Sequence, residues 1–370
     1  MRPKKGMAQT LTAISGAFLL AIVGYTVLAQ EAAPPAPPPA AAAPAANGAP
    51  GASGRGRVGG GKVGRPAAGF NIPQSDTPWS WDVVAMEDAV PAKAYATPKQ
   101  ARKILVVCKT AGFVHSSVPL AAATMKELGD RTGAWSTQIT YDPAEINAQN
   151  LQPYDLIFLA STTGQFLDDP NNEELTTERR QALLNFVRSG KGLAGVHAAV
   201  DSYHTSPSMG GRGRGADESF VPAGTWPDYN KMIGGFFKWH WLYPQVITVK
   251  IDDLNSPLTQ MFHGQEFLIH DETYTMAQDS YSLQNVHELT SIDYSKMSQE
   301  DKDKEPAASR RTDGDYGLSW IRREGKGRVF IEVLGHDEHL YEMPVYLEHL
   351  LAGTQYALGD LRANDAPTER

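Results

Sequence analysis

Short apolar runs alternate with amphipathic segments from residue 103 onward, and this alternation constrains the fold more than any other feature. Four runs have the length and composition of strands and cover residues 103–108, 135–142, 154–161 and 192–198. The segments 118–131 and 176–190, which lie between them, have the apolar spacing of helices. Strands that are largely apolar and alternate with helices predict an α/β fold. We expect a mostly parallel sheet with helices on both faces.

The alternation loosens after residue 204, but further strands follow. Runs typical of strands cover residues 244–251, 266–276, 317–323 and 327–335. The last two runs are expected to form a hairpin whose turn lies at 324–327. A helix at 344–358 closes the domain, and the polar, glycine-rich residues 206–224 predict a loop.

The chain shows no internal repeat, which favours one folded domain. We expect this domain to cover residues 103–362. An extended lead-in at 67–102 is expected to pack its aromatic side chains onto the domain, and a short tail follows at 363–370.

The first 66 residues carry the marks of export rather than of a fold. Residues 1–29 combine a basic start, an apolar stretch and small residues before Gln30, as in a secretory signal peptide. Cleavage near Ala29 gives a periplasmic or secreted protein, whereas an uncleaved signal anchors the N-terminus in a membrane. Residues 30–66 are rich in Pro, Ala and Gly and predict a disordered linker.

Charge and cysteine content exclude several classes of protein. The whole chain has a formal net charge of −8, and residues 1–66 carry +6, so residues 67–370 carry −14. An acidic body disfavours nucleic acid as a partner and broad attachment to an anionic membrane. Cys108 is the only cysteine, which excludes internal disulfides and cysteine-rich zinc modules. Its place in the first predicted strand indicates a buried apolar role.

Four of the ten histidines come at or shortly after the end of an apolar run, and these are His115, His197, His270 and His336. A single histidine at a strand end is commonly just a polar residue where the chain leaves the core. Ligands in open α/β sheets bind outside the carboxyl ends of the strands. If the four runs point the same way, their histidines gather at one edge of the sheet. We therefore expect a shared site there.

Four segments resemble, in order, the ThuA-like (trehalose utilisation) family. They read GKGLAGVHAA at 190–199, WPDYNKMIGGFFKWH at 226–240, HDETYTM at 270–276 and GKGRVFIEVLGHDEHLYEMPVYLEHLLAGTQYALG at 325–359. The resemblance covers residues 103–359, almost the whole predicted domain. It implies the flavodoxin-like fold of the class I glutamine amidotransferase-like superfamily. It also implies a link to the catabolism of trehalose-type disaccharides and their keto derivatives.

One departure from that superfamily removes its typical reaction. The amidotransferase relatives carry a nucleophilic Cys in a Gly-x-Cys-x-Gly turn, whereas this chain has Gly195-Val196-His197-Ala198-Ala199. Because no thiol is present at this turn, glutamine amidotransferase and cysteine peptidase activities are disfavoured. His197 takes the nucleophile's position, where an imidazole suits acid–base work or metal ligation.

The candidate site residues fall into three groups. The expected catalytic residues are His197, His270 and Glu272, of which the last two share a face if their strand continues. The expected substrate-binding residues are His115, Asp201, Trp239 and Tyr274. His240 and His336 are candidate ligands of a divalent metal, zinc or manganese, because imidazoles and carboxylates are the ligand set of these ions.

These observations give one function hypothesis and one alternative. We expect an exported enzyme of sugar catabolism that acts on a trehalose-type disaccharide or a 3-keto-glycoside. The reaction is a hydrolysis, an elimination or an isomerisation, carried out by histidine and carboxylate groups or with a metal. The alternative is a non-catalytic carbohydrate-binding protein on the same fold. A small carbohydrate is the expected partner in both cases, and the sequence does not indicate an oligomeric state.

Overall fold

The structure is a computed structural model that describes residues 64–204 and 225–369. The predicted signal peptide, the predicted linker up to residue 63 and the loop predicted at 206–224 lie outside the described residues. Within the two described ranges, nine strands form one sheet, and helices pack on it. No helix in these ranges is long and apolar enough to cross a membrane.

Five strands form the parallel half of the sheet. In spatial order they are β2 (Ser136–Thr140), β1 (Lys103–Val107), β3 (Leu156–Ala160), β4 (Gly192–Val196) and β9 (Gly327–Glu332). The four strands inside the β2 edge are buried on both faces, and successive residues enter two separate cores. In β1, for example, Ile104 enters one core and Leu105 the other. The parallel α/β arrangement predicted for this part of the chain is confirmed.

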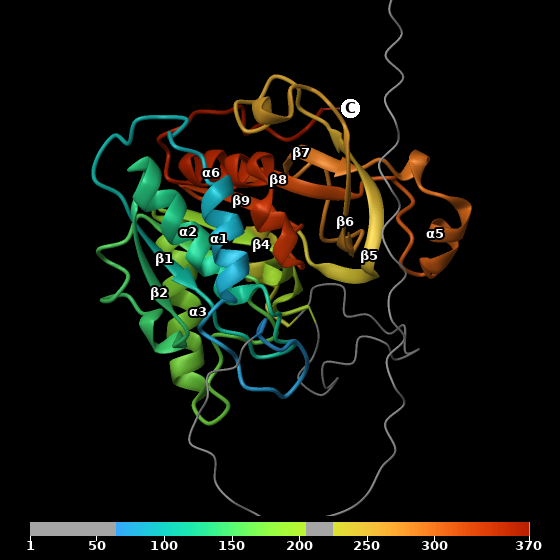
Figure 1. Ribbon diagram of the computed structural model, residues 1–370. Helices are drawn as coiled ribbons and strands as arrows, with labels where there is room; N and C mark the ends of the chain where they lie inside the picture. Colours follow the sequence, from blue (N-terminus) through green and yellow to red (C-terminus); the bar gives the residue numbers. More distant parts are fainter. Residues whose placement is uncertain (1–63, 205–224, 370) are drawn as a thin grey trace, which may run out of the picture. The chain divides into compact units, whose positions relative to one another are not determined.

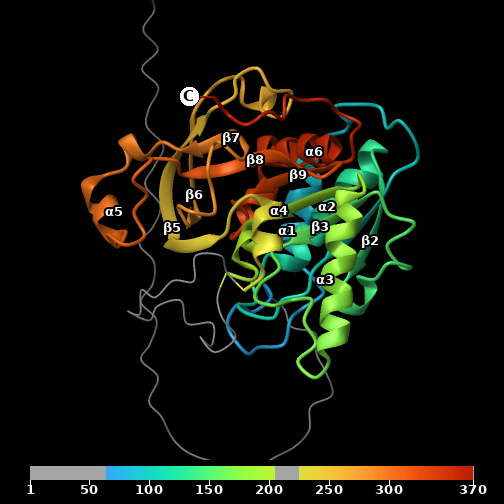
Figure 2. The same cartoon turned by 180° about the vertical axis from the view of Figure 1, so that it is seen from behind.

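Helices cover both faces of this half, as predicted. α1 (Ser80–Ala89), α2 (Val118–Thr132) and α6 (Pro344–Ala357) pack on one face (Figure 1). α3 (Glu173–Arg188) and α4 (Pro227–Ile233) pack on the other face, which Figure 2 shows from behind. Local signals fix several ends, since Asn172 caps α3 by accepting a hydrogen bond from Leu175 N and α2 ends at Gly133 in the left-handed conformation.

The other half of the sheet is antiparallel, which corrects the prediction of a mostly parallel sheet. It continues from β9 as β8 (Gly317–Glu324), β7 (His287–Ile292), β5 (Phe237–Ile251) and β6 (Phe267–Met276). The turn at Gly325-Lys326 joins β8 to β9 as the predicted hairpin. Such a short connection reverses the chain direction, whereas parallel neighbours need a crossover of about a dozen residues or more. The hairpin signals therefore already argued against parallel pairing here.

The lead-in at 67–102 is not extended throughout, because residues 80–89 form α1. This helix has no strong apolar stripe, so its sequence does not predict it. Contacts with the rest of the domain hold it instead. Met86 in this helix and Val90, directly after it, are buried, and Arg65 forms an ion pair with Asp82 at 2.9 Å.

Candidate functional site

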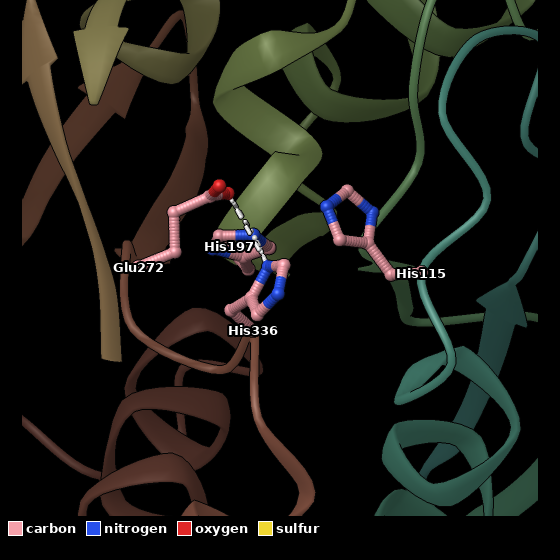
Figure 3. Close-up of side chains that lie close together, drawn as sticks. All are labelled: His115, His197, Glu272 and His336. Carbon is pink, nitrogen blue, oxygen red and sulfur yellow. Dashed lines mark hydrogen bonds and ion pairs between the residues drawn. The ribbon is translucent and has the colours of Figure 1, made fainter. Parts of the chain in front are cut away.

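Three histidines and a glutamate meet at the carboxyl edge of the parallel strands (Figure 3). His115 lies in the loop after β1, His197 directly follows β4, and His336 lies in the loop after β9. Glu272 comes from β6 in the antiparallel half. One nitrogen or oxygen atom from each of these side chains lies within 4.8 Å of the others. We refer to His115, His197, Glu272 and His336 as the histidine–glutamate cluster.

His197 lies at the apex of a tight turn between β4 and the 3₁₀ turn His197–Asp201. Its φ of 45° lies in the left-handed region, which non-glycine residues rarely adopt. The turn leaves little room around Gly195, where an added Cβ would lie 2.8 Å from the Cβ of Ala199. A strained turn at the end of a strand lifts its apical side chain out of the sheet edge, as in the elbows that carry nucleophiles.

Hydrogen bonds assign the tautomer of His197. Its Nδ1 lies 3.1 Å from the carbonyl oxygen of Val333 and must carry the ring proton, because a carbonyl only accepts. Nε2 of the neutral ring therefore presents a lone pair to the cluster. It lies 3.1 Å from the hydroxyl of Tyr274, 3.4 Å from Oε2 of Glu272 and 3.3 Å from Nδ1 of His336. The structure thus places Tyr274, a predicted substrate-binding residue, directly on the His197 ring.

Glu272 is the charged centre of this group. Its Oε2 contacts His197 and His336, the latter at 3.3 Å, and its Oε1 lies 2.9 Å from Nδ1 of His240. Burial opposes ionisation of Glu272, but its contacts with the three imidazoles outweigh it and hold its pKa well below the usual value. Burial also opposes protonation of His336, yet its contact with Glu272 outweighs this and raises its pKa. The direction of the Glu272 shift favours the carboxylate form of this side chain.

His115 completes the cluster from the opposite side. Its side chain is buried, and its Nδ1 has no hydrogen-bond partner among the described residues. Its ring stands edge-on to His197, with centroids 4.7 Å apart, and to His336 at 5.2 Å. Burial, followed by the nearby His197 and His336, holds the pKa of His115 well below its ordinary value. Both effects favour the neutral form of the His115 imidazole.

Asp271 positions His336, although it is not among the residues predicted for the site. Its carboxylate is fully buried and accepts hydrogen bonds from three successive backbone N–H groups, those of Gly335, His336 and Asp337 at 2.8, 3.3 and 3.1 Å. Burial raises the pKa of Asp271. Side chains alternate along a strand, so a residue next to Glu272 is directed to the other side of β6. That alternation was the available signal for a supporting role.

The structure does not bring His270, an expected catalytic residue, into the cluster. The strand β6 continues through His270 to Met276, so this residue is not at a strand end. Its side chain is exposed and stacks on His339, with ring centroids 4.2 Å apart. His270 and Glu272 do lie two residues apart on one strand, but the imidazoles that contact Glu272 are His197, His240 and His336.

Two predicted substrate-binding residues also lie outside the cluster. The carboxylate of Asp201 lies 2.7 Å from Nδ1 of His204, and this pairing raises the pKa of His204 although burial opposes it. Trp239 is partly buried and packs edge-on against Trp241, with centroids 4.9 Å apart. His240, a predicted metal ligand, reaches the cluster only through Glu272.

Aromatic side chains that sequence reasoning did not select border the cluster. The Tyr243 ring stacks on His336 at 5.9 Å between centroids, and 42% of the residue is exposed. On the other side, Phe113 packs against His115 at 4.8 Å, and the exposed Phe70 packs against Phe113 at 5.1 Å. The histidines thus lie between aromatic side chains, of which Tyr243 and Phe70 are exposed.

Comparisons with known proteins agree with this architecture. A family model named ThuA and described as trehalose utilisation matches residues 103–357. Among solved structures, a ThuA-like protein from Bacteroides uniformis ATCC 8492 has a TM-score of 0.50 and 19% identity, covering 71% of this chain and 94% of that chain. A ThuA-like protein from Parabacteroides merdae ATCC 43184 has a TM-score of 0.46 and 14% identity, covering 72% and 93%. A search of the curated proteins finds no match.

Proposed function

This chain belongs to the ThuA family, described as trehalose utilisation, and we propose that it is an enzyme of sugar catabolism acting at the histidine–glutamate cluster. The substrate is a trehalose-type disaccharide or a 3-keto-glycoside. One observation carries the proposal: the largely buried carboxylate of Glu272 lies 3.4 Å from Nε2 of His197 at the carboxyl edge of the sheet. Ligands of open α/β sheets bind at this edge.

The cluster supports two kinds of chemistry on a sugar. Without a metal, His197 accepts a proton from a hydroxyl group or from a carbon next to a keto group, and Tyr274 and His336 pass protons to and from it. With a metal, the same groups would hold the ion, and the chemistry that it would supply is polarisation of a sugar oxygen. Both routes depend on His197 and Glu272, so removal of either side chain is expected to abolish turnover.

Thiol chemistry does not fit the chain. Cys108 follows β1 and is fully buried, and burial raises the pKa of its thiol to about 12. A thiol of this kind is almost entirely protonated at neutral pH and is a poor nucleophile. Position 197, where the amidotransferase relatives carry their cysteine, holds an imidazole. These facts support the exclusion of amidotransferase and cysteine peptidase activity.

The aromatic border of the cluster supports a carbohydrate as ligand. A sugar ring has apolar C–H faces that pack on aromatic rings, while its hydroxyl groups form hydrogen bonds with polar groups at its edge. Tyr243 and Phe113 provide such surfaces on two sides of the histidines. Tyr243 also interacts through its hydroxyl with Asp337, which raises its pKa to about 12 and holds the ring beside the cluster.

A substrate panel tests the proposal. Wild type, His197→Ala and the exposed-site control His263→Asn are incubated with disaccharides and their 3-keto derivatives, with and without added zinc or manganese. Mass spectrometry should detect a product from wild type and the control and none from His197→Ala. If wild type converts no panel member, the enzyme proposal fails. If it binds a sugar without converting it, the protein is the carbohydrate-binding module that the sequence left as the alternative.

We also propose that the protein is exported, because residues 1–29 have the features of a signal peptide. The intact gene product is expressed in a Gram-negative host, and its periplasmic and cytoplasmic fractions are separated. Mass spectrometry of the mature N-terminus should find a chain that begins near Gln30 in the periplasm. A full-length chain found only in the cytoplasm contradicts export, and a full-length chain in the membrane fraction indicates an uncleaved anchor.

A further inference from the structure

We propose that His115, His197, Glu272 and His336 together bind one divalent transition-metal ion, with zinc favoured by the geometry. This assignment refines the proposed function, since the ion would serve the same site. It differs from the sequence prediction in its ligands. His336 remains a ligand, whereas His240 contacts only the carboxylate of Glu272 and is assigned to the outer layer of the site.

The distances between three of the proposed ligand atoms match a metal site. Nε2 of His197, Oε2 of Glu272 and Nδ1 of His336 are separated by 3.4, 3.3 and 3.3 Å. Zinc lies about 2.0–2.1 Å from nitrogen and oxygen ligands in a tetrahedral site, so neighbouring ligand atoms are roughly 3.3–3.4 Å apart. The triangle therefore has the dimensions of one face of a zinc tetrahedron.

The three atoms of this triangle would be stabilised by a positive charge between them. In the neutral ring Nε2 of His197 is an acceptor, because Nδ1 donates to Val333 O, and the carboxylate of Glu272 only accepts. The single hydroxyl proton of Tyr274, 3.1 Å from Nε2 of His197, can be donated to only one of these two acceptors, which lie 3.4 Å apart. A single proton on His336 Nδ1 lies 3.3 Å from both acceptors and cannot be directed well at both. One cation satisfies all three atoms at once.

His115 supplies the fourth ligand. It is only 4% exposed, and among the residues that the structure describes its Nδ1 finds no hydrogen-bond partner. In Figure 3, His115 lies across the cluster from Glu272, and its other ring nitrogen points toward Glu272 and His336. Ligation of a metal by this second nitrogen would give the buried ring a polar partner and so offset part of the free energy that its burial costs. Three neutral imidazoles and one carboxylate leave a zinc complex with a net charge of +1.

An outer layer of contacts holds these ligands in place. The carbonyl of Val333 fixes the tautomer of His197, and His240 contacts the second oxygen of Glu272. Asp271 holds the backbone on both sides of His336. Metal-binding histidines and carboxylates in proteins characteristically have such partners. His197, Glu272 and His336 therefore have the hydrogen-bond partners that are typical of metal ligands, which an ordinary group of packed core residues does not need.

Metal content tests the assignment without reference to any substrate. Full-length wild type is purified in zinc-supplemented buffer, dialysed and analysed by mass spectrometry for zinc and manganese. We expect about one zinc per chain, and a competing chelator should give a dissociation constant at least about 100-fold weaker for Glu272→Gln and His336→Ala. His270→Ala, two residues from Glu272 on the same strand, is the matched control and should keep its zinc.

A second readout needs no variant and covers the case in which the substitutions unfold the protein. Cobalt replaces zinc in tetrahedral sites and then absorbs strongly in the visible range. Wild type loaded with cobalt should show these bands and lose them when zinc is added. Stoichiometric manganese without visible cobalt bands supports the four ligands but replaces zinc with an octahedral ion.

Three results overturn the proposal. One is wild type that binds no divalent ion tightly, so that protons alone bridge the cluster. Another is a metal that Glu272→Gln and His336→Ala retain while folded. The third is a metal lost from His270→Ala. Bound metal without turnover of any panel sugar contradicts the proposed function but not the metal site. Turnover by protein that binds no metal contradicts the metal site but not the proposed function.

Discussion

Asp271 determines where His336 lies, because its buried carboxylate accepts hydrogen bonds from the three N–H groups of residues 335–337. Two of these bonds end on Oδ2 and one on Oδ1, so both oxygens are used. An asparagine keeps only one acceptor oxygen and turns an NH₂ group toward a backbone donor. The loop that carries His336 thus depends on the charge of Asp271 as well as on its shape.

Asp271→Asn is expected to lower the free energy of unfolding by about 1–3 kcal/mol, since it leaves a buried N–H group unsatisfied. Urea denaturation measures this, with the exposed Asp279→Asn as the control that should change nothing. The same variant should also weaken binding of zinc. An unchanged urea midpoint for Asp271→Asn would show that the three hydrogen bonds do not hold the loop.

At the residue scale, the sequence located part of the site. His197 and His336 were identifiable because His197 directly follows β4 and His336 lies in the loop after β9, and both strands are recognisable from their apolar runs. His270 misled for the same reason, since the apolar residues 267–269 are followed by polar residues that still belong to β6. The backbone contacts of Asp271 depend on how the antiparallel half packs on the loop after β9. No local pattern contains that information.

The turn at His197 is the element on which the site depends. A left-handed backbone costs a non-glycine residue about 1–2 kcal/mol, and only the surrounding packing keeps His197 in it. Ala198, the next residue, is not among those with positive φ. The two neighbouring positions therefore respond to glycine in opposite ways.

His197→Gly is predicted to be more stable than His197→Ala by about 1 kcal/mol, because both lose the imidazole and only alanine retains the backbone strain. Ala198→Gly should show the ordinary sign and destabilise the protein by roughly 0.5–1 kcal/mol. Chemical denaturation of the three variants gives both differences. If the glycine variant at 197 is no more stable than the alanine variant, the turn is not strained.

Some helices and strands could be predicted from their own sequences, and others could not. β1, β3 and β4 are buried on both faces, so their uninterrupted apolar runs predict parallel strands directly. β7 and α1 lack such a signal. Four of the six residues in the strand HELTSI are polar, yet all six are buried in the middle of the antiparallel half, between β5 and β8. Tertiary contacts decided these elements.

Across the whole molecule, the site needs both halves of the sheet. The parallel half supplies His115, His197 and His336 from the ends of its strands, and the antiparallel half supplies Glu272 and Tyr274. The prediction of a mostly parallel sheet therefore did not anticipate that Glu272 comes from an antiparallel strand. It did place the histidines at the carboxyl edge of the parallel strands, where the structure has His115, His197 and His336.

The lead-in is part of the folded unit rather than a spacer. Gln355, fully buried in α6, accepts hydrogen bonds from the backbone N–H groups of Tyr95 and Ala96 and donates one to Ala96 O. Met86 and Val90 are buried in the same core. Removal of these residues leaves an apolar surface exposed and the Gln355 amide without its partners.

A chain that begins at Arg102 is therefore expected to be at least about 3 kcal/mol less stable than a chain that begins at Gly64. The comparison controls for loss of the first 63 residues, which both chains lack. Guanidinium denaturation of the two proteins measures the difference. Equal midpoints would mean that the lead-in packs on the domain without stabilising it.

The binding of a carbohydrate at the histidine–glutamate cluster is tested most directly by NMR of the protein with ¹⁵N-labelled histidine side chains. The titrant is whichever panel sugar binds wild type by calorimetry. We predict that the imidazole signals of His115, His197 and His336 shift with saturation, while those of His263, His287 and His349 stay in place. Binding that leaves the first three signals unchanged, or a panel in which no sugar binds, would contradict the proposed site.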